Sequence, residues 1–159
     1  MYTNPGNPTG ANYSKEEVEL LVSIAKEKNI FLISDEPYRE YVFEGKQIYL
    51  LDYMEEIPEQ AILLDTVSKR WALCGARCGI FLSKNKNLVN ATMRLAMGRL
   101  SAGVIDQAVC AALGDVPPSY MENVINEYRR RRDLLYEGLN DIPGVSLPKP
   151  EGAFYMMVR

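Results

Sequence analysis

Short apolar runs and stretches with helical spacing alternate along this chain. Residues 30–34 and 61–65 are unbroken apolar runs that end in polar residues, and residues 79–83 form a similar third run. Runs of this length are typical of strands buried on both faces of a parallel sheet. Residues 2 and 3 form a strand-like pair, and a last strand is expected at residues 153–158.

A first helix is predicted between the opening loop and the first apolar run. Ser14 and Glu17 have the spacing of a capping box, in which each side chain bonds the backbone N–H of the other residue. Val18, Val22 and Ala25 follow at helical intervals. The pattern therefore predicts an amphipathic helix that extends as far as residue 29.

Three further helices are predicted in the second half of the chain. They occupy residues 88–100, 104–113 and 119–140. Strands mixed with helices predict an α/β fold, here a mostly parallel sheet with flanking helices. Two adjacent prolines, at positions 117 and 118, indicate a boundary at which the long last helix leaves the first domain.

Net charge and apolar runs restrict the partners that the chain is expected to have. The 159 residues include 18 Lys and Arg and 21 Asp and Glu, so the formal net charge is −3. Such a chain has no general field that attracts nucleic acid or anionic membranes. No apolar run approaches the roughly 20 residues of a membrane span. Three cysteines without framework spacing favour reduced thiols and a cytoplasmic location.

The sequence contains no histidine. Its absence excludes Ser–His and Cys–His nucleophile pairs, and every metal site that is ligated by histidine. Proton transfer near neutral pH then requires a carboxylate of raised pKa, a lysine of lowered pKa, or a cysteine.

Residues 4–10, N-P-G-N-P-T-G, predict a rigid loop. Each proline fixes its own backbone and restricts the preceding asparagine to extended conformations. Prolines lack the amide donors from which a phosphate cradle is built. The asparagine side chains, rather than the loop backbone, are therefore the candidate ligand contacts.

Polar clusters follow two of the predicted strands. Asp35 and Tyr38 follow the first, and Thr66, Ser68 and Lys69 follow the second. In open α/β sheets, ligands bind beyond the carboxyl ends of the strands. Neighbouring strands lie about 4.8 Å apart, so we expect the two clusters to face one small ligand.

An arginine and a lysine suggest which chemistry this ligand supports. Arg77 lies between Gly75 and Gly79, whose backbone freedom is expected to let the guanidinium reach an anion. Without histidine, a lysine that acts through a carbonyl adduct is the best remaining catalyst. Lysine forms Schiff bases, and pyridoxal 5′-phosphate (PLP) enzymes pair such a lysine with an acidic partner for the pyridinium nitrogen.

Four ordered motifs resemble those of the fold-type I PLP-dependent aminotransferases, specifically the aspartate aminotransferase-like subgroup of class I/II. They are N-P-G-N-P-T-G, S-D-E-P-Y, T-V-S-K followed by G-A-R-C-G, and E-G-A-F-Y. The resemblance covers the whole chain, which corresponds to less than half of a full-length member. It implies a fragment in which residues 1–117 form the C-terminal half of a large cofactor-binding domain, residues 118–140 an interdomain helix, and residues 141–159 the beginning of a small α+β domain.

The resemblance also implies a role for each residue that contacts the cofactor ring. Lys69 forms the Schiff base with PLP and, once displaced by the substrate amine, removes and returns the substrate α-proton. Asp35 pairs with the pyridine nitrogen and keeps it protonated. Asn7 and Tyr38 bond the phenolic oxygen of the cofactor.

The remaining matched residues are implied to hold the cofactor phosphate. Thr66 and Ser68 supply hydroxyl groups, and Arg77 is the main charge partner. The implied reaction transfers an amino group from an L-amino acid, with aspartate as one candidate, to a 2-oxo acid, and the parent enzyme is implied to be a homodimer. Members of the family bind the substrate carboxylate with an arginine further downstream, and Arg159 is not assigned this role.

Two other functions remain open from the sequence. A PLP-dependent lyase of the same fold shares the cofactor residues, because only the substrate contacts decide the reaction. A catalytically incomplete remnant that acts as a folded or interaction module is the second, because the ring-stacking aromatic residue and the glycine/serine phosphate loop of the family have no counterpart here. Taken singly, Asp35, Lys69 and Arg77 also suit an ordinary helix cap and solvated surface charges.

Overall fold

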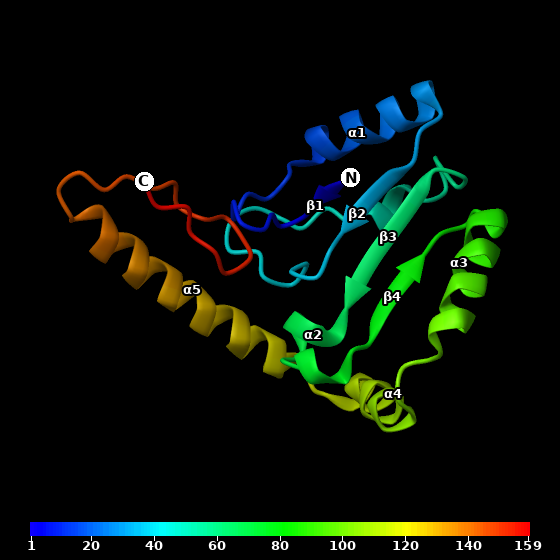
Figure 1. The fold of residues 1–159 in the computed structure, drawn as a ribbon. Coiled ribbons are helices and arrows are strands. Elements are labelled where there is room, and N and C mark those ends of the chain that lie inside the picture. The colour runs from blue at the N-terminus through cyan, green and yellow to red at the C-terminus, as the bar shows by residue number, and fades with distance from the viewer.

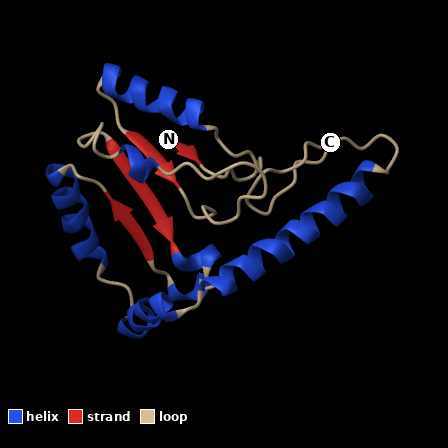
Figure 2. Ribbon diagram, turned by 180° about the vertical axis from the view of Figure 1, so that it is seen from behind, coloured by secondary structure: helices blue, strands red, loops and turns tan.

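The computed structural model describes residues 1–159 and contains a four-stranded mixed sheet in the order β1-β2-β3-β4. Strands β1 (Tyr2–Thr3), β2 (Leu32–Asp35) and β3 (Ala61–Thr66) are parallel, whereas β4 (Gly79–Leu82) is antiparallel to β3. Figure 2 shows the opposite direction of β4 at the edge of the sheet. This arrangement confirms the predicted α/β fold with a mostly parallel sheet.

The chain also forms five α-helices and three short 3₁₀ helices. The α-helices are α1 (Lys15–Lys28), α2 (Val67–Arg70), α3 (Lys86–Arg99), α4 (Val104–Ala111) and α5 (Pro118–Asn140), and the 3₁₀ helices are η1 (Leu50–Tyr53), η2 (Cys74–Ala76) and η3 (Ala112–Asp115). Helix α5 leads away from α4 as one long rod, and the segment after it turns back toward the first residues (Figure 1). No helix in the chain combines the length and the apolarity that crossing a membrane requires.

The predicted helix starts are found where local capping chemistry places them. Ser14 Oγ accepts the backbone N–H of Glu17 at 3.2 Å, and a Glu17 carboxylate oxygen accepts the backbone N–H of Ser14 at 2.8 Å. This reciprocal pair confirms the capping box of α1. Helix α5 begins with Pro118 in its first turn, where a missing N–H costs nothing.

The prediction of a strand at residues 153–158 is wrong. This segment has no regular secondary structure; it has isolated backbone contacts, from the Ala153 N–H to the Tyr41 carbonyl oxygen at 2.8 Å and between Ser146 and Arg159, beside the single bridge between Val42 and Gly152. A strand requires a continuous backbone partner. Phe154 instead packs its ring against Tyr38 and Tyr41, so aromatic contacts replace the ladder that the apolar pattern suggested.

The first predicted strand is also displaced. Strand β2 begins at Leu32, and the preceding Ile30 and Phe31 lie outside it with about half of their surface exposed, 51% and 54%. The apolar run therefore predicted the strand but not which of its members are buried. Burial depends on the cover supplied by α1, whose Val18, Val22 and Ala25 lie over the sheet farther along.

Two hydrophobic clusters hold the structure together. The larger joins the buried face of α1 to the sheet and to residues 50–57, and includes Val18, Leu32, Leu50 and Leu63. The smaller consists of Tyr38, Tyr41, Phe43 and Ala153, with partly buried residues of α5 and Tyr155 against them. Helices α3 and α4 contain no buried residue, so neither contributes to these clusters.

The opening loop is held by the C-terminal part of the chain. The backbone N–H groups of Glu151 and Gly152 donate to the carbonyl oxygen of Gly10 at 2.8 and 2.9 Å. Figure 1 shows the red C-terminal segment beside the blue loop that follows β1. Because β1, β2 and β3 are parallel, this loop lies at the sheet edge where β2 and β3 also end.

Candidate active site

The end of β3 turns directly into the short helix α2. Thr66 is the last residue of the strand and the N-cap of the helix, and its Oγ1 accepts the backbone N–H of Ser68 at 3.2 Å. A hydroxyl at the N-cap satisfies an amide that would otherwise lack a partner. This local chemistry explains why Ser68 and Lys69 lie on a helical turn, an element that the sequence pattern did not predict.

The hydroxyl groups of Thr66 and Ser68 lie together. Their oxygen atoms lie 2.8 Å apart, and Thr66 Oγ1 also donates to the carbonyl oxygen of Cys78 at 2.9 Å. Cys78 follows Arg77, so these bonds fasten the start of α2 to the segment that carries the arginine. Two hydroxyl groups and one guanidinium group are therefore placed on neighbouring segments.

Arg77 lies in a left-handed backbone conformation with φ 51°. From the sequence, Gly75 and Gly79 are expected to provide the backbone freedom for a bend here. Neither glycine has a positive φ, and Arg77 itself makes the turn. Arg77 Nη1 donates to the carbonyl oxygen of Cys74 at 3.0 Å, and its side chain is exposed. The guanidinium forms no ion pair, so most of its donors are free for an anion.

Lys69 is partly buried and its amine is not paired with any carboxylate. Nζ lies 4.0 Å from Cys74 Sγ, and that thiol donates to the carbonyl oxygen of Ser68 at 3.0 Å. The Lys69 backbone is fixed from a different direction, because the Tyr41 hydroxyl donates to its carbonyl oxygen at 3.0 Å. Burial raises the pKa of Tyr41 to about 12, which keeps this donor protonated.

Tyr38 lies next to two of the other predicted residues. Burial and a hydrogen bond with the Tyr155 hydroxyl both raise the pKa of Tyr38, whereas the Asn7 side chain lowers that pKa and the charge of Asp35 raises it slightly. These effects require Asn7 and Asp35 to lie near the Tyr38 hydroxyl. The structure therefore brings Asn7, Asp35 and Tyr38 into one group.

Asp35 carries a half-buried carboxylate that accepts no side-chain or backbone hydrogen bond and forms no ion pair. Burial raises the pKa of Asp35, and the charge of Asp65 raises it further. A cation placed against this carboxylate would reverse both effects, since an opposite charge favours the ionised form. The geometry thus suits a cationic ring nitrogen.

The predicted residues form two groups rather than one continuous network. No hydrogen bond or ion pair joins the group of Asn7, Asp35 and Tyr38 directly to the group formed by Thr66, Ser68, Lys69 and Arg77. The register of β2 and β3 places Asp35 opposite Leu64, two residues before Thr66. The groups thus lie on neighbouring strands at the same end of the sheet, and Asp35, Lys69 and Arg77 form no ion pair there.

A partly open pocket exists elsewhere in the structure. It has a volume of about 170 Å³ and lies between α5 and residues 150–156, with mainly apolar and aromatic lining that includes Tyr128 and Phe154. None of the predicted site residues lines it. The candidate site at the strand ends is therefore distinct from this pocket.

Comparison with known proteins identifies the family. The family described as Aminotransferase class I and II matches residues 1–159. The chain belongs to this family. The aspartate aminotransferase of Bacillus sp. (strain YM-2) is 32% identical over 159 residues, which are 99% of this chain and 40% of that protein. The aromatic-amino-acid aminotransferase 2 of Thermococcus litoralis is 34% identical and covers all of this chain, which spans 41% of that protein.

Solved structures agree with the aminotransferase assignment. The aspartate aminotransferase from Thermus thermophilus with maleate superposes with a TM-score of 0.88 and 32% identity, over 98% of this chain and 41% of that structure. The predicted family and the predicted fold are therefore confirmed. The chain spans about 40% of the length of the curated relatives that it matches.

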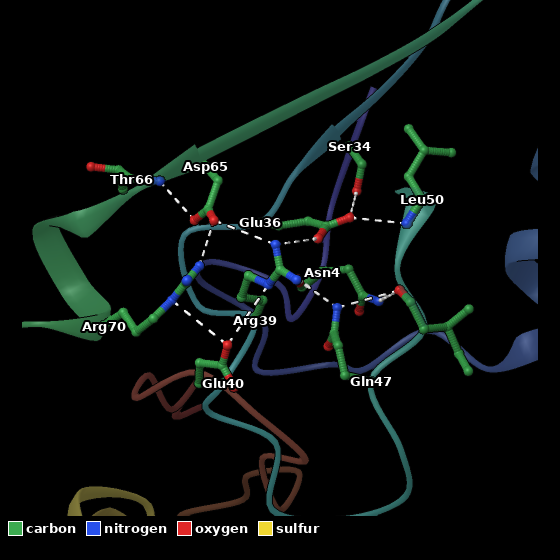
Figure 3. Close-up of polar contacts among 11 residues, drawn as sticks. Asn4, Ser34, Glu36, Arg39, Glu40, Gln47, Leu50, Asp65, Thr66 and Arg70 are labelled. Atoms are coloured by element: carbon green, nitrogen blue, oxygen red, sulfur yellow. Dashed lines mark hydrogen bonds and ion pairs between the residues drawn. The ribbon is translucent and has the colours of Figure 1, made fainter. Parts of the chain in front are cut away.

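Several residues near the site of this aminotransferase-family chain were not identified from the sequence. Tyr155 belongs to the quoted E-G-A-F-Y motif, yet its hydroxyl contact with Tyr38 was not predicted. Asp65, Arg39 and Arg70 form a charged cluster beside the strand ends (Figure 3). The motif was a usable signal for Tyr155, whereas nothing local distinguishes these two arginines from surface residues.

Proposed function

We propose that this chain is the PLP-binding part of an aminotransferase that transfers an amino group from an L-amino acid to a 2-oxo acid. The observation that carries this proposal is the position of three charged residues without ion pairs, Asp35, Lys69 and Arg77, at the end of the sheet where β2 and β3 stop and β4 starts. Membership of the aminotransferase family supports it. PLP offers a cationic ring nitrogen, an aldehyde and a phosphate, which are complementary to these three groups.

In this proposal, one group of residues binds the cofactor phosphate and the other binds the cofactor ring. Arg77 binds the phosphate together with the hydroxyl groups of Thr66 and Ser68. When bound, PLP supplies the electron sink that stabilises negative charge at the substrate α-carbon. The hydroxyl group pair, 2.8 Å apart, is suited to the phosphate because both oxygens belong to one short turn.

The ring is held by the other group. Asp35 faces the pyridine nitrogen, and Tyr38 and Asn7 bond the phenolic oxygen. Lys69 would hold the cofactor through Nζ, and the same atom would accept the α-proton of the substrate and return it. Its amine has no carboxylate partner to give up before it acts, which favours this role.

The similar proteins also bear on the substrate and the assembly of the parent enzyme. Both aspartate and aromatic-amino-acid aminotransferases are similar to this chain, which supports an L-amino acid substrate, of which aspartate is one candidate. We propose a cytoplasmic, homodimeric parent enzyme in which residues 1–117 belong to the large domain, residues 118–140 form the interdomain helix and residues 141–159 begin the small domain.

Reductive trapping tests the proposal. The purified chain is incubated with PLP, reduced with borohydride, and digested for peptide mass spectrometry. We expect a pyridoxyl adduct on Lys69 that Lys69→Ala abolishes and that Lys26→Ala, a change at an exposed lysine of α1, leaves intact. Labelling spread evenly over the lysines, or unchanged total labelling in Lys69→Ala, would contradict the proposal.

A product assay separates transfer from elimination. Protein that carries the Lys69 adduct in the first experiment is incubated with an L-amino acid and a 2-oxo acid, and amino and keto products are identified by mass spectrometry. Formation of a new amino acid from the 2-oxo acid supports the aminotransferase. Release of ammonia without a new amino acid would favour a lyase instead.

A further inference from the structure

The segments that carry Asp35 and Lys69 are joined by a cluster of charged side chains, formed by Glu36, Arg39, Glu40, Asp65 and Arg70 and named here the arginine–carboxylate cluster. We propose that Asp65, through Arg39 and Arg70, is a positioning residue that holds Lys69 in place relative to Asp35. The inference rests on the proposed function, since Lys69 and Asp35 are cofactor contacts only there. The proposal concerns Asp65, Arg39 and Arg70, which are not proposed to contact the cofactor.

Asp65 uses both carboxylate oxygens. Its side chain is 5% exposed, and Oδ1 accepts the backbone N–H of Thr66 at 2.7 Å. Oδ2 accepts from Arg70 Nη2 and from Arg39 Nη1, the latter at 3.4 Å (Figure 3). One carboxylate therefore contacts the residue that caps α2, the residue that ends α2, and the turn that follows β2.

Glu40 closes the cluster from the opposite side. A single oxygen of Glu40, Oε1, lies 3.8 Å from Arg39 Nε and 3.7 Å from Arg70 Nε. The two guanidinium groups are therefore bridged twice, once by Asp65 and once by Glu40 (Figure 3). Planar guanidinium forks with two acceptors are more strongly oriented than single contacts.

The cluster is anchored to a third segment through Glu36. Arg39 Nη1 lies 3.9 Å from Glu36 Oε2, and the Glu36 side chain is completely buried. Glu36 Oε1 accepts the Ser34 hydroxyl at 2.8 Å and the backbone N–H of Leu50 at 3.1 Å. The Arg39 guanidinium also stacks over Tyr49, 4.4 Å from the ring centroid, so the arginine has little room to move.

Helix α2 needs such external support to hold one orientation. It has four residues, Val67–Arg70, and one helical turn is not stable by its own hydrogen bonds. The Lys69 side chain makes no ion pair that would fix it. The position of Lys69 is therefore set by Asp65 and Thr66 before it, by Arg70 after it, and by the Tyr41 hydroxyl on its carbonyl oxygen.

The alternative is a cluster that only stabilises the fold. Breaking a buried ion pair by removing one partner is costly in any protein, so loss of stability alone does not show positioning. The discriminating readouts are the selectivity of reductive PLP labelling for Lys69 and the amide hydrogen exchange of residues 66–71. Hydrogen exchange of α1 is measured in the same variants as the control, because it reports global opening.

Three variants make the test. Asp65→Asn removes the bridging charge, and Arg70→Lys keeps the charge of Arg70 but removes its planar fork. Arg130→Gln is the matched control, because Arg130 pairs with Glu127 on the exposed surface of α5. We expect Asp65→Asn to lower the fraction of label on Lys69 by about tenfold, as small misplacements of reacting groups do, and Arg70→Lys to lower it less. Arg130→Gln should match the unmodified chain.

Each outcome decides the inference. Faster exchange at residues 66–71 with unchanged exchange in α1, together with lost selectivity for Lys69, supports positioning. Folded variants that label Lys69 and exchange residues 66–71 like the unmodified chain overturn it, and Arg70→Lys decides if Asp65→Asn does not fold. If the unmodified chain itself shows no selectivity for Lys69, the proposed function fails, and the exchange of residues 66–71 in the variants still decides the positioning inference.

Discussion

The hydroxyl groups of Tyr38 and Tyr155 share a hydrogen bond although the two residues lie 117 positions apart in the sequence. Their rings also pack edge to face, with centroids 5.4 Å apart and planes at 87°. This contact ties the turn after β2, which carries proposed cofactor contacts, to the irregular segment near the end of the chain. The part of the candidate site that is proposed to hold the PLP ring is thus shaped by the turn after β2 and by the segment that contains Tyr155.

Removal of either hydroxyl group should expose how far the two tyrosines depend on one another. Tyr38→Phe and Tyr155→Phe each leave one hydroxyl without this partner, and each is expected to lower the free energy of unfolding by about 1 kcal/mol. The double variant should cost less than the sum, because it leaves neither group unpaired. Urea denaturation of the four proteins measures the difference, and strictly additive costs would show that the pair is not coupled.

Gly152 should not tolerate a side chain. A Cβ atom there would lie 2.6 Å from both Cβ and Cγ of Pro5 and 2.8 Å from the carbonyl oxygen of Tyr41. We expect Gly152→Ala to lower the free energy of unfolding by roughly 1–3 kcal/mol, since ring and backbone atoms would have to move.

Gly138→Ala is the matched control for this substitution. Gly138 lies within α5, and a Cβ atom there meets nothing within 4 Å. The same change should therefore raise stability by up to about 1 kcal/mol, because alanine is the better helix former. Thermal unfolding of both variants checks the opposite signs, and a Gly152→Ala protein as stable as the unmodified chain would contradict the close approach to Pro5.

Glu36 should make the stability of the chain depend on pH. Burial raises the pKa of Glu36 above its ordinary value of 4.5, against the smaller lowering effects of Leu50, Ser34 and Arg39. The folded state therefore holds the proton at pH values where the unfolded state has lost it. By linkage, this contribution to stability is complete below pH 4.5 and is lost as the pH rises through the folded-state pKa.

Glu36→Gln removes this titration while keeping an oxygen that can accept from Ser34 and Leu50. We expect the variant to lose less stability than the unmodified chain as the pH rises from about 4 to 7, a range set by the ordinary carboxyl pKa. Urea midpoints across this range provide the measurement, with Glu59→Gln at an exposed position as the control for lost charge. Identical slopes in the Glu36→Gln and unmodified proteins would refute the assignment.

Features that depend on neighbouring residues could be predicted from the sequence. The Ser14 cap was found, and the helix expected at residues 119–140 and the strands expected at residues 30–34 and 61–65 were found with bounds that differ by at most two residues, because each follows from spacing within a few residues. The four motifs also selected the residues that the structure gathers at one sheet edge. Their roles toward PLP remain proposals, which the trapping experiment addresses.

Features that depend on distant partners could not be predicted in this way. An apolar pattern at residues 153–158 does not reveal that no strand lies beside it, and the pattern around Ile30 and Phe31 does not reveal how far α1 extends over the sheet. Arg39 and Arg70 resemble solvated surface charges until the fold places both against Asp65. Tertiary contacts decide such cases, and no local rule contains them.

The hydrogen bonds from Glu151 and Gly152 to Gly10 have a consequence for the order of folding. They join positions near opposite ends of the chain, and the entropy of closing a loop rises with its length. Contacts of such large separation form slowly, whereas β2, β3 and α2 pair over shorter distances and emerge earlier during synthesis. The loop that carries Asn7 is therefore expected to take its final position last, after β2, β3 and α2 have formed.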